Sequence, residues 1–221
     1  MIGLIACASE EAPEAPPLTR EQAADEVVFA STQALGAYTM HATIRVEDTL
    51  PELPPQIGEQ VVSLRWKDDD HWAFALTRDG RVRAESMVWD GAGFRGEGGK
   101  VERVADAEPL RVQLASSWDP WALAFESVRD QLRIVPGDVG TYEGRRAVPH
   151  ALEVVPLDKK ARRGWIVEAA SGEVWLDELT ALRVKAEVHV RATSGRHTRV
   201  TTLSLAVTGI GTDPVIDPPA P

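Results

Sequence analysis

The segment from Leu182 to Val207 constrains the fold most, because apolar and polar residues alternate along it for longer than in an ordinary strand. Side chains on a strand point alternately to opposite faces, so the pattern predicts one apolar and one polar face. Ser194 and Gly195 turn the chain, and His197–Val207 returns as an antiparallel partner. Such long hairpins build strongly curved sheets. The predicted apolar face holds Leu182, Val184, Ala186, Val188, Val190 and Ala192, and the polar face holds Arg183, Lys185, Glu187, His189 and Arg191.

The segments before this hairpin predict two helices and a meander of antiparallel strands. Thr19 and Gln22 form a capping box, apolar residues follow at helical spacing, and Gly36 is the expected stop. A period of two then predicts a strand over 38–47. Tight turns at 68–70, 79–80 and 90–91 separate further strands. The second helix is predicted to begin at Asp119-Pro120 and to bury Trp121, Phe125, Val128 and Leu132 before a loop at 136–138; strands resume over 147–155 and 165–169.

Composition limits the classes of protein to which the chain can belong. It has 221 residues, of which 43% are hydrophobic, enough for one substantial core. A net charge of -10 argues against nucleic-acid binding, which needs clustered Lys and Arg. No run approaches the roughly 18 apolar residues of a spanning helix. We expect a single domain over 18–211, a monomer, followed by a loose proline-rich tail over 212–221.

The single cysteine, Cys7, follows Leu4-Ile5-Ala6, which resembles a bacterial lipobox. We interpret 1–7 as the remnant of a lipoprotein signal peptide, and Cys7 as the lipidation site. A complete signal would need about fifteen further residues upstream with a Lys or Arg and an apolar run; an ordinary cysteine is the alternative. Residues 8–17 are rich in Pro and Glu, which predicts a disordered tether of roughly 30 Å. The predicted location is therefore the periplasmic face of the outer membrane.

Three patterns resemble binding sites. Residues 91–96 match G-x-G-x-x-G, but the segment after them reads as a strand, so two glycine-rich turns are favoured over a nucleotide site. Asp68-Asp69-Asp70-His71 offers metal ligands, but a solvated turn is the simpler interpretation and we predict no metal. Lys159-Lys160-Ala161-Arg162-Arg163 could contact phosphates or an acidic partner, although a solvated loop is favoured. His41 and His189 fall on polar strand faces.

Signatures of catalysis are missing. The chain has no Gly-x-Ser-x-Gly, no His-Glu-x-x-His and no activated cysteine. We therefore predict a protein that is not an enzyme and that needs no cofactor. An enzyme based on acidic residues such as Asp68 and Asp70 is the third and weakest hypothesis.

Residues 172–186, Gly-Glu-Val-Trp-Leu-Asp-Glu-Leu-Thr-Ala-Leu-Arg-Val-Lys-Ala, resemble the bacterial lipoprotein-localisation-factor superfamily, as does the order of elements over 18–211. The superfamily includes a periplasmic carrier and its outer-membrane receptor. The resemblance implies an α+β, mainly antiparallel fold: one strongly curved, unclosed β-barrel of about eleven strands, with helices covering the concave face. It also implies that lipid chains bind between sheet and helices. No clear match to the receptor's protruding apolar loop is found.

The hypothesis is a lipid-anchored, non-catalytic domain that binds an acyl chain or a lipidated protein in an apolar cleft, with a role in lipoprotein or lipid trafficking. The chain has seven tryptophans, whose bland interpretation is packing of helix on sheet. The alternative function is therefore an anchored structural or interaction module whose core is filled by its own side chains. The predicted lining residues are Tyr38, Met40, Ile44, Leu64, Trp66, Trp72, Phe74, Trp89, Trp121 and Phe125.

Overall fold

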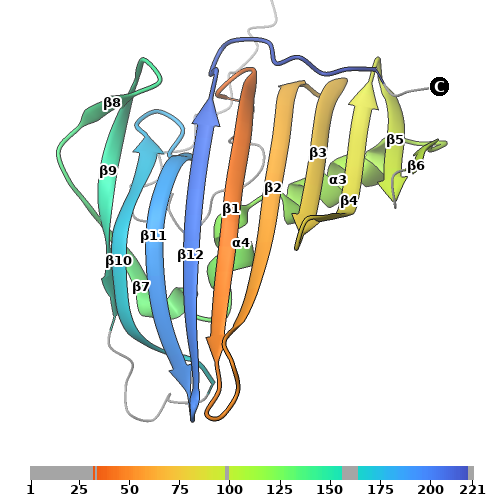
Figure 1. The fold of residues 1–221 in the computed structure, drawn as a ribbon. Coiled ribbons are helices and arrows are strands. Elements are labelled where there is room, and N and C mark those ends of the chain that lie inside the picture. Colours follow the sequence, from red (N-terminus) through yellow and green to blue (C-terminus); the bar gives the residue numbers. More distant parts are fainter. Residues whose placement is uncertain (1–31, 33, 98–99, 156–163, 219–221) are drawn as a thin grey trace, which may run out of the picture.

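The computed structural model describes residues 32, 34–97, 100–155 and 164–218, which form one curved, unclosed antiparallel sheet of twelve strands (Figure 1). Along the sheet the order is β6-β5-β4-β3-β2-β1-β12-β11-β10-β9-β7, and β8 pairs only with β9. The strands are β1 (Tyr38–Thr49), β2 (Gln56–Asp68), β3 (His71–Arg78), β4 (Arg81–Trp89), β5 (Ala92–Glu97), β6 (Lys100–Arg103), β7 (Leu132–Pro136), β8 (Gly140–Tyr142), β9 (Arg145–Val154), β10 (Ile166–Asp177), β11 (Arg183–Ser194) and β12 (His197–Thr208).

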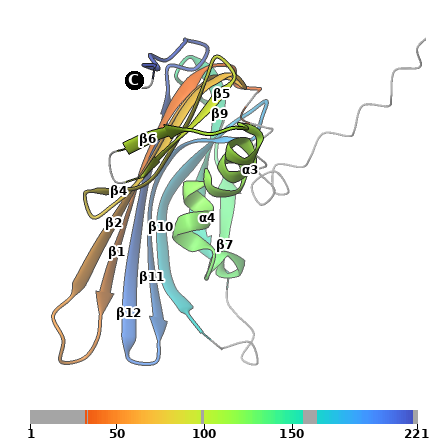
Figure 2. The ribbon, with the colours of Figure 1, turned by 90° about the vertical axis from the view of Figure 1, so that its right-hand side faces the viewer.

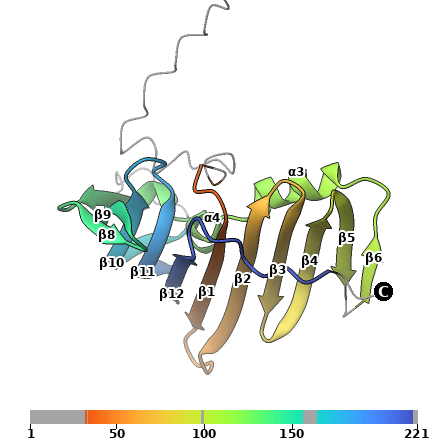
Figure 3. The ribbon, with the colours of Figure 1, turned by 90° about the horizontal axis from the view of Figure 1, so that it is seen from above.

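The long hairpin predicted from the sequence is confirmed as β11 and β12. Buried and exposed residues alternate along β11 from Ala186 to Ala192, and β12 pairs with it in continuous register from Lys185↔Ala206 to Ser194↔His197. β12 also pairs with β1 over its whole length. The N-terminal and C-terminal strands are therefore joined in the middle of the sheet, and the sheet curves on both sides of this joint (Figure 3).

The meander from β2 to β6 is also confirmed, and its turns explain their sequences. Asp79-Gly80 and Asp90-Gly91 both adopt positive φ at two successive residues, 50° and 73° in the first pair and 46° and 72° in the second. Two-residue hairpin loops of this kind match the twist of the flanking strands and favour Asp-Gly. The strand after 91–96 is β6, so the G-x-G-x-x-G pattern belongs to strands and turns.

The helical segments lie on one side of the sheet (Figure 2) and are α3 (Glu108–Ser117), α4 (Pro120–Phe125) and the 3-10 turn η1 (Arg129–Gln131). We call the side of the sheet on which they lie the helix face, and the opposite side the outer face. α4 contacts β12 and β1 at the centre of the sheet. The predicted helix at Asp119-Pro120 exists, but its predicted continuation to Leu132 is wrong.

The reason for the early end is the segment around Gln131. The helix stops at Phe125, and Leu132–Pro136 forms the edge strand β7 against β9. The buried Gln131 side chain donates to the Trp165 carbonyl and accepts from the Val167 N–H, both at 2.8 Å. These hydrogen bonds hold Gln131 beside the start of β10, and the chain continues from there as the strand β7.

The core is one cluster of buried side chains between the helix face and the helices. It includes Leu110 and Leu114 of α3 and Phe125 of α4, each at most 1% exposed. The predicted first helix lies mostly outside the described residues, but Leu35 is buried and Gly36 has φ of 74°, as expected at a helix stop. In the part of the chain that is described, no helix combines the length and apolar character needed to cross a membrane.

The motif on which the resemblance depends forms the end of β10 and the turn into β11. Asp177 is 2% exposed, accepts from the Thr180 N–H and hydroxyl at 2.9 Å, and pairs with Arg145 at 2.7 Å. Burial by itself would raise the pKa of Asp177, but the hydrogen bonds from Arg145 and Thr180 outweigh it and hold the pKa below its usual range. The turn is therefore held by a buried ion pair and by hydrogen bonds to Asp177.

The segment after β12 differs from the predicted loose tail. It passes along the ends of β1 to β4 (Figure 1). Arg65 donates to the Val215 carbonyl at 2.9 Å, Lys67 pairs with Asp213 at 2.8 Å, and Ile216 is 7% exposed. These contacts fasten residues 213–216 to the sheet.

Candidate functional site

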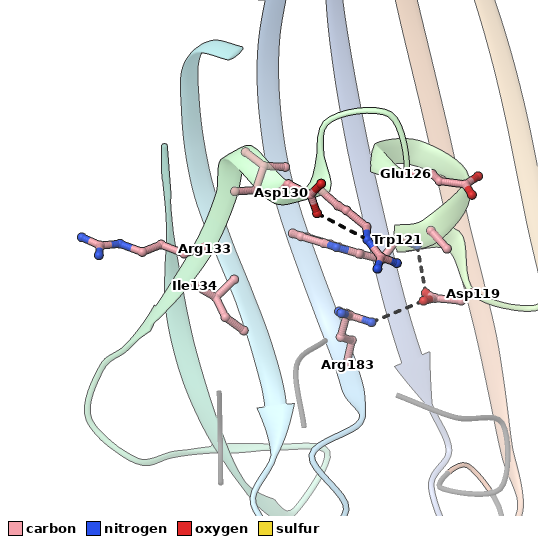
Figure 4. Close-up of a pocket in the computed structure, with 10 residues that line it drawn as sticks. Asp119, Trp121, Glu126, Asp130, Arg133, Ile134 and Arg183 are labelled. Atoms are coloured by element: carbon pink, nitrogen blue, oxygen red, sulfur yellow. Dashed lines mark hydrogen bonds and ion pairs between the residues drawn. The ribbon is translucent and has the colours of Figure 1, made fainter. Parts of the chain in front are cut away.

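A pocket of about 330 Å³ lies between α4, η1, β7 and the start of β11 (Figure 4). Its volume is at the lower end of the range of small-molecule sites. The lining combines an aromatic ring and aliphatic side chains with acidic and basic groups. The lining residues are Asp119, Trp121, Ala122, Glu126, Arg129, Asp130, Leu132, Arg133, Ile134 and Arg183.

α4 begins as the sequence predicts and thereby places two of these side chains. Asp119 is the N-cap, and its Oδ1 accepts a hydrogen bond from the Trp121 N–H at 3.0 Å, while Pro120 occupies the first turn. The rings of Trp121 and Phe125 meet edge to face at 4.8 Å. Phe125 is fully buried in the core, and Trp121 faces the pocket.

Arg183 reaches the pocket from β11, and this contradicts the prediction that it lies on the polar outer face. The register between β10 and β11 shifts between Trp175↔Lys185 and Leu176↔Arg183, so one residue of β11, Val184, is extra. A bulge of this kind re-aims the side chains beyond it. Arg183 therefore turns to the helix face and is 8% exposed.

Arg183 there makes two contacts with α4 (Figure 4). Its Nη1 lies 3.4 Å from Asp119 Oδ2, and its guanidinium lies 5.0 Å from the centre of the Trp121 ring. A cation over an aromatic face contributes about 0.5 to 2 kcal/mol, depending on desolvation. Losing the acidic partner of a buried cation costs about 3 to 5 kcal/mol, because the remaining charge is uncompensated. Arg183 and Asp119 thus tie α4 to the sheet.

The other charged groups at the pocket are more exposed. Arg129 pairs with Asp130 at 3.8 Å and Arg133 with Glu153 at 2.7 Å. Exposed ion pairs contribute about 0 to 1 kcal/mol. These exposed side chains can leave their partners at little cost, whereas the buried Arg183 needs an anion beside it.

Most of the predicted lining residues lie together on the helix face, but they fill it. The seven from β1, β2 and β3 are at most 5% exposed and belong to the core cluster: Tyr38, Met40, Ile44, Leu64, Trp66, Trp72 and Phe74. Of all ten, only Trp121 lines the pocket beside α4. Trp66 and Trp72 also border a second hollow, of about 420 Å³, under α3. Burial raises the pKa of the Tyr38 hydroxyl.

Trp89 does not join the others. It pairs with His71 across β4 and β3, while its neighbour Val88 pairs with Trp72 and is fully buried. Strand alternation therefore places Trp89 on the outer face, where its ring meets His71 at 5.5 Å. To line the hollow as predicted, the Trp89 side chain would have to lie on the helix face of β4, which Val88 occupies.

The acidic run at 68–71 forms an ion-pair cluster on a turn. His71 Nδ1 lies 2.9 Å from Asp68 Oδ1 and His71 Nε2 lies 2.9 Å from Asp90 Oδ1. The hydrogen bonds to Asp90 and Asp68 raise the pKa of His71, because both carboxylates favour the imidazolium. Within the described ranges no group of three or more His, Cys, Asp and Glu side chains is arranged to hold a metal ion. Cys7 and the basic run at 159–163 lie outside those ranges.

Sequence reasoning missed most of this pocket. The sequence predicts Trp121 in the lining, but it predicts Arg183 on the other face and places Arg133 and Ile134 in the helix before the loop at 136–138. The available signal was the β-branched pair Ile134-Val135 before Pro136, which is typical of an edge strand. No sequence signal identifies the bulge beside Arg183.

No family model and no curated protein match this chain. Its fold is similar to a LolA superfamily protein from Nitrosomonas europaea, with 11% identity, 90% of this chain and 93% of that chain covered, and a TM-score of 0.25. It is similar to LprF from Mycobacterium bovis, with 14% identity, coverage of 91% and 97%, and a TM-score of 0.32. It is also similar to a chain in the structure of the Pseudomonas aeruginosa MucA/MucB complex, with 19% identity and a TM-score of 0.30. This match covers 87% of this chain and 58% of that chain.

At such identities and TM-scores the likeness carries no argument about family or function.

Proposed function

We propose that this protein is a non-catalytic lipid-binding domain of the cell envelope, which takes an acyl chain or the acylated end of a protein at the pocket beside α4. The observation that carries the proposal is that only a short helix covers the sheet beside this pocket. The apolar helix face of an unclosed sheet lies behind a helix of six residues, and Trp121, Leu132 and Ile134 continue its apolar surface into the pocket. In this proposal α3 and α4 are the cover of the concave face.

Transfer of the tail from water opposes the cost of moving α4. Each methylene that leaves water contributes about 0.8 kcal/mol. Withdrawing Phe125 from the core as α4 moves costs at most about 3 kcal/mol of apolar burial. The proposed lining behind α4 is Tyr38, Met40, Ile44, Leu64, Trp66, Trp72 and Phe74.

The proposed location depends on the N-terminal segment. Leu4-Ile5-Ala6-Cys7 supports acylation of Cys7 and anchoring at the outer membrane, with 8–17 as the tether. Mass spectrometry of the N-terminal peptide from envelope-purified protein tests this: a diacylglyceryl mass on Cys7 is expected, and an unmodified thiol would contradict it.

A second function is favoured by one specific observation. The predicted lining residues on β1 to β3 are at most 5% exposed and already fill the helix face. A domain with this filled core could serve as a structural or interaction module without a lipid ligand.

The experiment that separates the two is analysis of lipid extracted from the full chain after purification without detergent. We expect the wild type to carry lipid and Ile134→Glu, which places a charge in the pocket, to carry much less. Leu179→Glu is the matched control, because Leu179 is 83% exposed on the β10–β11 turn, away from the pocket lining. Absence of lipid from the wild type, together with failure to bind added fatty acid, would favour the filled module.

A further inference from the structure

The charges in the pocket beside α4 leave two kinds of amphiphile open. Three arginines and three acidic residues line it: Arg129, Arg133, Arg183, Asp119, Glu126 and Asp130. An anionic head group would pair with an arginine, and a cationic one would pair with a carboxylate. The formal charges cancel, so their sum cannot decide between the two.

Burial decides between them. The Arg183 side chain is 9% exposed and that of Asp119 is 23% exposed. A guanidinium stays charged at any ordinary pH, so Arg183 needs an anion beside it. A cationic head group that captured Asp119 would leave this buried cation without its acidic partner, which is strongly unfavourable. An anionic head group replaces Asp119 instead, and the released carboxylate oxygen reaches water.

The geometry of Asp119 allows this exchange without unfolding α4. Its Oδ1 caps the helix at the Trp121 N–H, while its Oδ2 faces Arg183. A ligand oxygen can take the place of Oδ2 while Oδ1 continues to cap the helix. In the structure Trp121 lies under the guanidinium and lines the same pocket, so an amphiphile with its head group at Arg183 would place its first methylenes beside this ring.

The other arginines add to the same preference. The side chains of Arg129 and Arg133 are 70% and 65% exposed, and their partners Asp130 and Glu153 are 91% and 45% exposed. Such pairs bind weakly, so both guanidinium groups are free to turn toward a ligand. Guanidinium is also the side-chain group best matched to a carboxylate or phosphate.

We propose that the pocket selects amphiphiles with an anionic head group, a carboxylate or a phosphate ester, and that Arg183 binds this group in place of Asp119. The inference rests on the proposed function, because it assumes that the tail of the same molecule enters behind α4. It adds the chemical class of the ligand and the residue that determines specificity.

The test is calorimetric titration of the full chain near neutral pH with four molecules that share one tail: dodecanoate, dodecyl phosphate, dodecanol and dodecylamine. We expect the two anions to bind at least about tenfold more tightly than dodecanol, a difference of about 1.4 kcal/mol, and the amine to bind no better than dodecanol. Dodecanoate and dodecyl phosphate together distinguish a fatty-acid site from a phospholipid site. Inorganic phosphate alone should bind far more weakly than dodecyl phosphate.

Three variants assign the effect to Arg183. Arg183→Gln should remove the preference for anions, and Asp119→Asn should strengthen anion binding several-fold. Arg191→Gln is the matched control, since Arg191 lies on the same strand, exposed on the outer face and paired with Glu168. If Arg183→Gln does not fold, Asp119→Asn still tests the exchange, and unchanged or weaker anion binding there would overturn it.

The outcomes separate the inference from the proposed function. Equal binding of dodecanol and dodecanoate, or tightest binding of dodecylamine, would overturn the head-group preference and leave lipid binding standing. If inorganic phosphate bound as tightly as dodecyl phosphate, the tail would contribute nothing to binding, and the proposal that the ligand is an amphiphile would be overturned. Failure of all four molecules to bind would overturn both proposals.

Discussion

The two helices on the sheet are held in different ways, and the difference indicates which of them a ligand can move. α3 buries Leu110 and Leu114 completely, and its ion pair from Arg111 to Asp70, at 3.2 Å, is largely exposed. α4 buries Phe125 but depends on the charge of Arg183, which is itself buried. Apolar contacts break only when the two surfaces separate, whereas a charged group in an ion pair can exchange its partner for a ligand of the same charge. α4 is therefore the helix with which an anionic amphiphile competes.

The largest effect is expected at α3. Leu114→Ala should lower the free energy of unfolding by about 3 to 5 kcal/mol, because the cavity adds to the lost burial. Urea denaturation measures this. Val112→Ala, on the same helix but 61% exposed, should change stability by less than about 0.5 kcal/mol. Similar effects of both changes would mean that α3 is not held by apolar burial.

The next effect concerns the ion pair at α4. Arg183→Ala should lower the free energy of unfolding by about 2 to 3 kcal/mol, less than for a fully buried pair because Asp119 is partly solvated. Arg111→Ala should cost at most about 1 kcal/mol, since its pairs are exposed. Urea denaturation of the two variants side by side tests this contrast between the helices. Equal losses of unfolding free energy would contradict the claim that α4 depends more than α3 on its ion pair.

A smaller effect is expected where α3 begins. A Cβ on Gly93 of β5 would lie 2.7 Å from Val104 Cγ2 and 3.0 Å from Ala107 Cα. Gly93→Ala should therefore cost about 1 to 2 kcal/mol through overpacking. Gly58→Ala is the control, because its nearest neighbour lies at 3.9 Å, and it should be neutral or slightly stabilising. A neutral Gly93→Ala in thermal denaturation would show that α3 can shift away from β5.

The smallest effect is a dependence on pH at the ion pairs of His71. Because Asp90 and Asp68 raise the pKa of His71 in the folded state, its contribution is fully present below the unfolded pKa near 6.5. It is lost as the pH rises through the folded pKa. His71→Gln should thus destabilise the protein by less than about 1 kcal/mol at acidic pH and not at alkaline pH. A loss that grew with pH would contradict the assignment.

Sequence reasoning succeeded where a long period of two could be read without interruption. The hairpin of β11 and β12, the Asp-Gly turns and the start of α4 all follow from local rules. α3 is not predicted because its N-cap, Ala107, makes no side-chain hydrogen bond; the weaker signals are Glu108 and Pro109 in the first turn and the spacing of Leu110 and Leu114.

The candidate site was predictable only in part, because it depends on contacts between distant segments. Trp121 follows from the helix start, but Arg183 turns inward through a bulge that depends on pairing with β10. The side of β4 on which Trp89 lies is likewise set by register with β3, which the composition of β4 alone does not determine. The alternation of apolar and polar residues shows which side chains share the helix face. It does not show that these side chains fill it, because that depends on packing.

Lipid binding beside α4 can be measured by fluorescence quenching with palmitate brominated beside its carboxylate, because the bromine of a bound molecule then lies at the pocket. Binding at this pocket predicts clear quenching of the wild type, most of which is lost in Trp121→Phe and kept in Trp175→Phe, whose ring lies on the outer face against Lys185. Absence of quenching in the wild type, or quenching of the same size in Trp121→Phe, would contradict binding at this pocket.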